Sequence, residues 1–173
     1  RILILGGVGF IGRNLVKHLV DTDQFDVVRV ADQAMPILRF ITPEFKEAFD
    51  NDKVEFVQCD LARQEHIDKA FAGDEKFDVV VNLCGETRFG LPEEDYQRKN
   101  LETAEACGRA ASEMGVSRWV EISSAQVYGS KGPANEEEKT EPWTRQANYR
   151  LEAENVLRDL GLPVVVLRPA IVY

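Results

Sequence analysis

The feature that most constrains this chain is an apolar run that leads directly into three glycines. Positions 2–5 read ILIL, and Gly6, Gly9 and Gly12 follow closely. Consecutive apolar positions predict a strand that is buried on both faces, as in a parallel sheet covered by helices. Apolar positions then continue at helical spacing from Phe10 and Ile11, so the glycines lie at a strand–turn–helix junction.

A junction of this kind is suited to a paired phosphate. Glycine lets the backbone bend tightly and approach a pyrophosphate, and the following helix offers unpaired N–H groups and the positive end of its dipole. We therefore predict that a dinucleotide binds at Gly6, Gly9, Phe10, Ile11 and Gly12. The alternative is a purely structural turn between a strand and a helix.

Apolar, β-branched runs alternate with segments of helical periodicity along the whole chain. Strands are expected at 2–5, 27–31, 54–58, 79–83, 119–123 and 164–168. Helices are expected at 10–20, 64–71, 94–114 and about 145–160, with a short one near 44–49. This alternation predicts an α/β fold with a doubly wound parallel sheet, as one domain over residues 1–173. Segment 129–143 is expected to be the one long surface loop.

Composition excludes several kinds of partner. The net charge is −9 and no basic stripe is present, which argues against nucleic acid or an anionic membrane surface. No apolar run approaches the roughly 20 residues that a membrane-spanning helix needs. Three cysteines without CxxC spacing indicate a reducing, intracellular compartment, either cytoplasmic or organellar. Because His18 and His66 are far apart on expected helices, we expect no metal site.

Carboxylates follow two of the expected strands. Asp32 lies after the second strand, 20 residues after Gly12. A carboxylate there can accept hydrogen bonds from both ribose hydroxyls of adenosine and would repel a 2′-phosphate, which favours NAD over NADP. Asp60, after the third strand, is placed either to contact an adenine edge or to cap the helix that follows.

Small and polar residues end the fourth and fifth strands. Asn82, Leu83 and Cys84 end the fourth, where they would let the chain pass beside a cofactor or simply make a tight turn. Ser124 follows the fifth strand, and its hydroxyl could polarise a substrate carbonyl.

Together these residues resemble the extended short-chain dehydrogenase/reductase family, which includes NAD-dependent epimerases and dehydratases of nucleotide sugars. The resemblance rests on GGVGFIG (6–12), Asp32, CDL (59–61), NLCG (82–85), Asn100, ISSAQVYG (122–129) and LRPAIVY (167–173). It implies a Rossmann sheet in the order 3-2-1-4-5-6 and a bound NAD(P) that Leu61 and Pro169 also contact. It places Ser124 at the position of the family's catalytic serine or threonine.

The resemblance also implies a C-terminal substrate domain, which would begin about where this chain stops. The chain starts inside a strand pattern at Arg1 and ends after another at Tyr173. We therefore expect it to be a piece of a longer protein.

One departure from the family concerns its Tyr-x-x-x-Lys pair, in which the tyrosine exchanges a proton with the substrate and the lysine holds the nicotinamide ribose. In the register that runs without a gap to LRPAIVY, Gln146 takes the tyrosine position and Arg150 the lysine position. A glutamine amide cannot exchange a proton near neutral pH, whereas arginine keeps a charge that could hold a ribose.

In a second register Tyr149 would be the tyrosine and Ala153 would stand in place of the lysine. Tyr149, however, lies on an apolar stripe at helical spacing, which is typical of core packing. We prefer the first register, in which the pair is missing.

The sequence therefore predicts an NAD-binding but catalytically silent protein, with a structural or regulatory role that could involve other protein subunits. The alternative is an active NAD-dependent epimerase, dehydratase or reductase. It would act on a nucleotide sugar or a small carbonyl compound, with Ser124 and Tyr149 as candidate catalytic residues.

Overall fold

Six parallel strands form one sheet at the centre of the protein. The computed structural model describes residues 1–39, 42–129 and 135–173. The strands run in the order β3-β2-β1-β4-β5-β6, which confirms the predicted Rossmann topology. Their bounds are β1 Ile2–Leu5, β2 Val28–Asp32, β3 Val54–Gln58, β4 Val79–Asn82, β5 Arg118–Ile122 and β6 Val164–Leu167.

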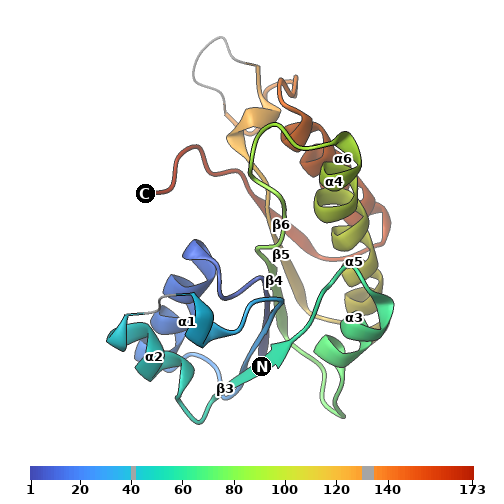
Figure 1. The fold of residues 1–173 in the computed structure, drawn as a ribbon. Coiled ribbons are helices and arrows are strands. Elements are labelled where there is room, and N and C mark those ends of the chain that lie inside the picture. Colours follow the sequence, from blue (N-terminus) through green and yellow to red (C-terminus); the bar gives the residue numbers. More distant parts are fainter. Residues whose placement is uncertain (40–41, 130–134) are drawn as a thin grey trace.

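Helices cover the sheet from both sides (Figure 1). On one side lie α1 (Phe10–Thr22) and the shorter α2 (Pro43–Phe49), which contact each other. On the other side lie α3 (Gln64–Phe71), α5 (Thr103–Met114) and α6 (Arg145–Asp159), with α5 between its two neighbours. The chain also forms two short 3-10 turns, η1 at Pro36–Leu38 and η3 at Ala125–Val127.

The core is divided by the sheet into two apolar layers. Because β1 is buried at every position, its side chains contribute alternately to both layers, as expected for a central parallel strand. Leu3 and Leu5 pack with Trp119 and Leu157 under α3, α5 and α6. Ile2 and Ile4 instead pack with Val16, Val28 and other residues under α1.

The helix predicted at 94–114 is present but is not uniform. It begins as α4 (Glu93–Tyr96), widens into the π-helical turn η2 (Gln97–Glu102) and continues as α5. Asn100, at the centre of the wide turn, is buried, and its Oδ1 accepts a hydrogen bond of 2.7 Å from the backbone N–H of Glu86. The widened turn thus lets a polar side chain reach the loop that follows β4.

Segment 129–143 has no helix or named strand in its described residues, as predicted, although Thr140 forms an isolated bridge with Tyr128, the residue before the segment. Residues 130–134 of this segment lie outside the described part. No helix within the described ranges is long and apolar enough to cross a membrane. Cys59, Cys84 and Cys107 have free thiols.

Candidate functional site

The glycine turn brings the end of β1 close to the start of α1. Gly6 has φ +76°, a backbone conformation that L side chains rarely adopt. At Gly12 a Cβ would lie only 2.5 Å from the Cα and carbonyl oxygen of Gly7, so only glycine lets the helix approach the turn this closely. The first turn of α1 has no side-chain cap and no acidic residue. Its N–H groups and its positive dipole end therefore suit an anion such as a pyrophosphate.

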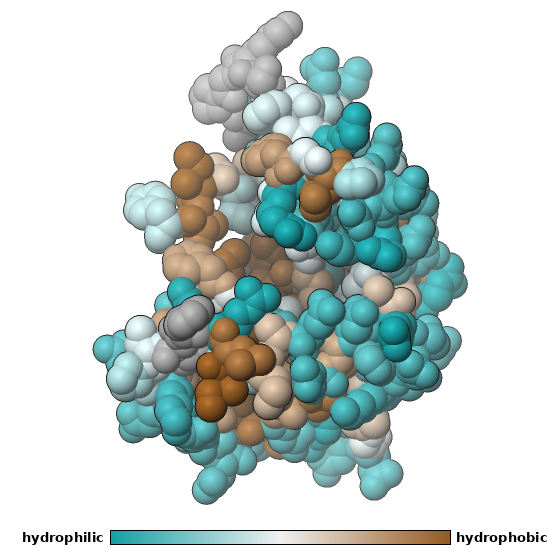
Figure 2. Space-filling view, in the orientation of Figure 1, coloured by the Kyte–Doolittle hydropathy of each residue, from teal (hydrophilic) through white to brown (hydrophobic). Residues whose placement is uncertain are grey.

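Two adjoining cavities lie along the carboxyl ends of the strands. The first, which we call the Asp32 cavity, has a volume of about 790 Å³ and lies over β1, β2 and β3. The second, the Ser124 cavity, measures about 500 Å³ and lies between the start of α1 and the ends of β5 and β6. The residues that line both are Gly6, Gly9, Leu83, Gly85 and Glu86. In the space-filling view the same face of the molecule is hollowed near its middle (Figure 2).

The Asp32 cavity contains the residues expected to contact adenosine. The carboxylate of Asp32 accepts hydrogen bonds of 2.9 Å from the backbone N–H groups of Val8 and Ala34, and so ties the end of β2 to the glycine turn. Asp60 and Leu61 line the same cavity, together with Cys84. Asp60 does not cap α3, which begins at Gln64 with Arg63 as its cap; instead its Oδ1 accepts a bond from the N–H of Ala62.

Asn82, a predicted cofactor contact, is not among the residues that line the two cavities. Its side chain is buried beneath the loop after β4, where Oδ1 accepts the N–H of Cys84 at 3.1 Å. Its Nδ2 donates to both carboxylate oxygens of Glu121 on the neighbouring strand β5, at 2.9 and 3.1 Å. Asn82 therefore shapes the loop rather than the inner surface of the cavity.

The Ser124 cavity brings together Ser124, Gln146, Arg150 and Pro169 with the N-terminal residues of α1. Ser124 caps η3 through its Oγ, which accepts the N–H of Gln126 at 3.1 Å. Gln146 is buried on the first turn of α6, where its Nε2 donates to the backbone oxygen of Arg88 at 3.1 Å. One turn further along the helix, the guanidinium of Arg150 donates to the backbone oxygens of Ile122 and Cys84.

Tyr149 lies apart from these residues. It is only half-buried, its hydroxyl donates to the Glu93 carboxylate at 3.1 Å, and it lines neither cavity. The expectation of core packing at this position is therefore wrong. Partial burial and the hydrogen bond to Glu93 raise the pKa of the Tyr149 hydroxyl, which makes it a poorer proton donor.

Two buried carboxylates near the cavities were not identified from the sequence. Glu86 accepts hydrogen bonds from the side chains of Arg88 and Lys99, which hold its pKa well below the usual range, so it is a permanent anion and a weak base. Glu121, in the middle of β5, accepts bonds from Asn82 and Trp119, and burial raises its pKa to about 7. A charged residue inside a central strand was the signal in the sequence that could have found Glu121.

A third buried carboxylate joins α6 to β6. Glu154 is fully buried and accepts hydrogen bonds from Arg168 at 2.6 and 3.0 Å, from Ser123 at 2.6 Å and from Arg158 at 3.2 Å. Arg168 also bonds the hydroxyl of Tyr128 at 2.5 Å. This network fixes the segment that carries Ser124 against the helix that carries Gln146 and Arg150.

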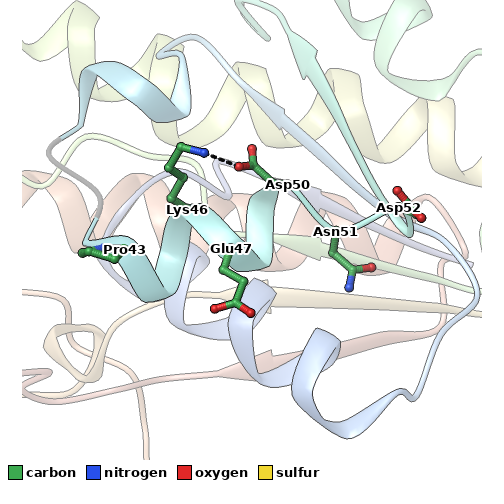
Figure 3. A pocket seen from close by; sticks show the side chains of 6 residues that line it. All are labelled: Pro43, Lys46, Glu47, Asp50, Asn51 and Asp52. Carbon is green, nitrogen blue, oxygen red and sulfur yellow. Dashed lines mark hydrogen bonds and ion pairs between the residues drawn. The ribbon is translucent and has the colours of Figure 1, made fainter.

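Another hollow, of about 510 Å³, lies against α2 and the turn after it, away from the glycine turn (Figure 3). Its side chains do not converge on one point: Lys46 pairs with Asp50, while Glu47 and Asn51 point away from that pair. Among the described residues no group of three or more His, Cys, Asp or Glu side chains is arranged to hold a metal ion.

The parallel sheet, the glycine turn and the cavities at the strand ends define a dinucleotide-binding α/β protein. Residues 2–173 match the model of the NAD dependent epimerase/dehydratase family, and the chain therefore belongs to that family. This confirms the resemblance seen in the sequence and the prediction of an NAD-type cofactor.

Similar proteins include enzymes of sugar metabolism. The chain is 25% identical to the low-salt glycan biosynthesis protein Agl12 of Haloferax volcanii and 28% identical to the UDP-glucose 4-epimerase of Azospirillum brasilense. The alignments cover 96% and 97% of this chain but 55% and 48% of those proteins. The chain thus spans about half the length of these curated relatives.

The fold is also that of solved structures. UDP-glucuronic acid 4-epimerase from Bacillus cereus, solved in complex with NAD, superposes with a TM-score of 0.83 at 23% identity. The superposition covers 99% of this chain and 57% of that one.

Proposed function

We propose that this chain is the NAD-binding part of an enzyme of the epimerase/dehydratase type, acting on a nucleotide sugar or a small carbonyl compound. The observation that carries the proposal is the pair of cavities that meet at Gly6 and Gly9, because a dinucleotide has two nucleoside halves joined by a pyrophosphate. The names of the relatives, which include a UDP-glucose 4-epimerase, favour an enzyme over a silent protein.

The described residues fit NAD in both halves of the site. In the Asp32 cavity, the carboxylate of Asp32 would accept the ribose hydroxyls of adenosine, and Asp60 and Leu61 would lie beside the adenine. The uncapped start of α1 would bind the pyrophosphate. In the Ser124 cavity, Arg150 would donate hydrogen bonds to the nicotinamide ribose, and Pro169 would lie beside the nicotinamide ring.

NAD, when bound, would supply a centre that accepts and returns a hydride. The Ser124 hydroxyl can hydrogen-bond a substrate oxygen at the mouth of the cavity, and the Gln146 amide can orient a polar group beside it. Neither side chain exchanges a proton readily near neutral pH, and Arg150 is a permanent cation. Turnover by this proposal therefore requires an acid or base other than Ser124, Gln146 and Arg150.

The proposal is tested by mass spectrometry of nucleotides released from the purified protein, followed by NAD titration. The protein is expected to bind NAD in preference to NADP. Asp32→Asn is expected to lower NAD affinity by about tenfold or more, since it removes the charge that accepts the ribose hydroxyls. The control is Asp21→Asn, which changes the same charge on the exposed part of α1. Release of NADP from the wild type, or unchanged affinity in Asp32→Asn, would contradict the proposal.

A second candidate function is NAD binding without turnover, in a structural or regulatory role. The observation that favours it is the placement of Gln146 and Arg150, one helical turn apart and both facing the Ser124 cavity. These are the positions at which the resemblance to the family predicts a tyrosine and a lysine. The side chains that stand there can bind a ligand but cannot act as an acid–base pair.

The two candidates differ in the activity of the full-length protein. Bound NAD without conversion of any nucleotide sugar tested would favour the silent protein, and Gln146→Tyr with Arg150→Lys would then be expected to introduce activity. Turnover that is lost in Tyr149→Phe would favour the enzyme with Tyr149 as its proton donor. Turnover retained in that variant would remove Tyr149 from the mechanism.

A further inference from the structure

Gly85, whose φ is +151°, lies in close contact with the guanidinium of Arg150. Gly85 follows β4 directly and lines both cavities. A Cβ built on Gly85 would overlap Nη2 of Arg150 and would lie 2.9 Å from its Cζ. Two of the three nearest atoms thus belong to one guanidinium, and the third is Oδ1 of Asn100 at 2.6 Å.

The guanidinium is held in this place from several sides. Its Nη1 donates to the backbone oxygen of Ile122 at the end of β5, and its Nη2 lies 3.5 Å from the backbone oxygen of Cys84. Burial lowers the pKa of the Arg150 guanidinium, and the nearby Glu121 carboxylate, when ionised, opposes that shift. Arg150 is 8% exposed, and it faces the Ser124 cavity.

Two backbone oxygens accept from two of the five N–H groups of an arginine, so the guanidinium retains donors for a ligand in the cavity. Its planar group also occupies a volume that the flexible stem and compact ammonium of lysine would not fill. An arginine can be placed here only where the residue after Cys84 has no side chain.

We propose that Gly85 is a positioning residue for Arg150. Because Gly85 has no side chain, the permanently charged guanidinium of Arg150 has room to lie at the base of the nicotinamide half of the site. The inference rests on the proposed binding of NAD and goes beyond it, because it names the contact that holds the Arg150 cation in place. Gly85 acts through Arg150 and has no contact with the ligand in this role.

The test is a double-mutant cycle read by NAD titration, with Gly85→Ala, Arg150→Lys and the two combined. Gly85→Ala is expected to lower the NAD affinity of the wild type by more than about tenfold. In the Arg150→Lys background, the same substitution is expected to lower NAD affinity by a factor that is at least about ten times smaller. Backbone strain at Gly85, whose φ is +151°, and its contact with Asn100 are present in both backgrounds and so cancel in the cycle.

Two controls separate this effect from others. Gly90 lies on the same loop and has φ +78°, but a Cβ built there would meet no atom within 4 Å. The substitution Gly90→Ala therefore measures backbone strain alone. ADP fills only the adenosine half of a dinucleotide site, and its affinity is expected to show no coupling between positions 85 and 150.

Each result decides the question. An equal loss of NAD affinity in both backgrounds would overturn the inference while leaving NAD binding intact. Failure of Gly85→Ala to fold, repaired by Arg150→Lys, would support it, and failure to fold in both backgrounds would count against it. A wild type that binds neither NAD nor ADP would reject the proposed function and this inference together.

Discussion

At the scale of single residues, the site is defined by which side chains can change their protonation state. Gln146 has no proton to exchange, and Arg150 keeps its charge. Glu86 is an anion held by two cations, whereas burial raises the pKa of Glu121 to about 7. The sequence revealed Gln146 and Arg150 through their spacing before LRPAIVY. It could not reveal the state of the two glutamates, because that state depends on partners from other elements.

The raised pKa of Glu121 predicts a specific dependence of stability on pH. In the unfolded chain this glutamate ionises near its ordinary pKa of 4.5, while in the folded protein it holds its proton to about pH 7. The folded state then binds more protons in that interval, so the free energy of unfolding should fall as pH rises from about 4.5 to 7. Chemical denaturation at pH 5 and pH 8 measures this difference.

Glu121→Gln is expected to flatten that part of the profile, because glutamine has no proton to lose. Relative to wild type, the variant should therefore gain stability as the pH rises. Glu113→Gln, an exposed change on α5, serves as the control. If the free energy of unfolding differed between Glu121→Gln and wild type by the same amount at both pH values, the raised pKa of Glu121 would be contradicted.

At the scale of secondary structure, periodicity predicted most of the fold. The strands 2–5 and 54–58 and the helix 64–71 have the predicted bounds, because each is a short segment with a clear apolar pattern. The π-helical turn η2 was not predicted. Within this turn Asn100 accepts a hydrogen bond from the backbone of Glu86, 14 residues earlier, and a pattern of burial along one helix does not record such a contact.

The Glu154 network predicts the outcome of removing one charge from α6. Glu154→Gln should destabilise the protein by about 3 to 5 kcal/mol, since it leaves the largely buried Arg168 without its carboxylate. Equilibrium denaturation measures the loss. Glu152→Gln, on the exposed face of the same helix, should change stability by less than about 0.5 kcal/mol. Equal effects of the two variants would show that the network is not what holds α6 to β6.

At the scale of the whole molecule, the order of the strands determines where the predicted residues meet. Asp32, Ser124 and Pro169 are far apart in the sequence, and they share one edge because every strand of the sheet runs in the same direction. The strand ends predicted this position for Asp32 and Ser124, and the resemblance to the family predicted it for Pro169. Asn82 also ends a strand, but its side chain points toward Glu121, and a strand pattern does not say which side of the sheet edge a side chain will face.

Binding at this edge should stabilise the entire domain. If NAD binds the folded chain alone, a concentration 100 times its dissociation constant should raise the free energy of unfolding by about 2.7 kcal/mol. Denaturation with and without NAD measures this change, and NADP at the same concentration is the control, for which Asp32 predicts a smaller increase. An unfolding curve that NAD at millimolar concentration does not change would contradict the prediction that NAD stabilises the domain.

Gly6 and Gly9 line both cavities, so the two compartments adjoin at this stretch of the chain. A small compound held in one compartment would lie beside a compound held in the other. Joining them with a short tether would make the second contact intramolecular, and two weak fragments would then combine into one tight chemical probe.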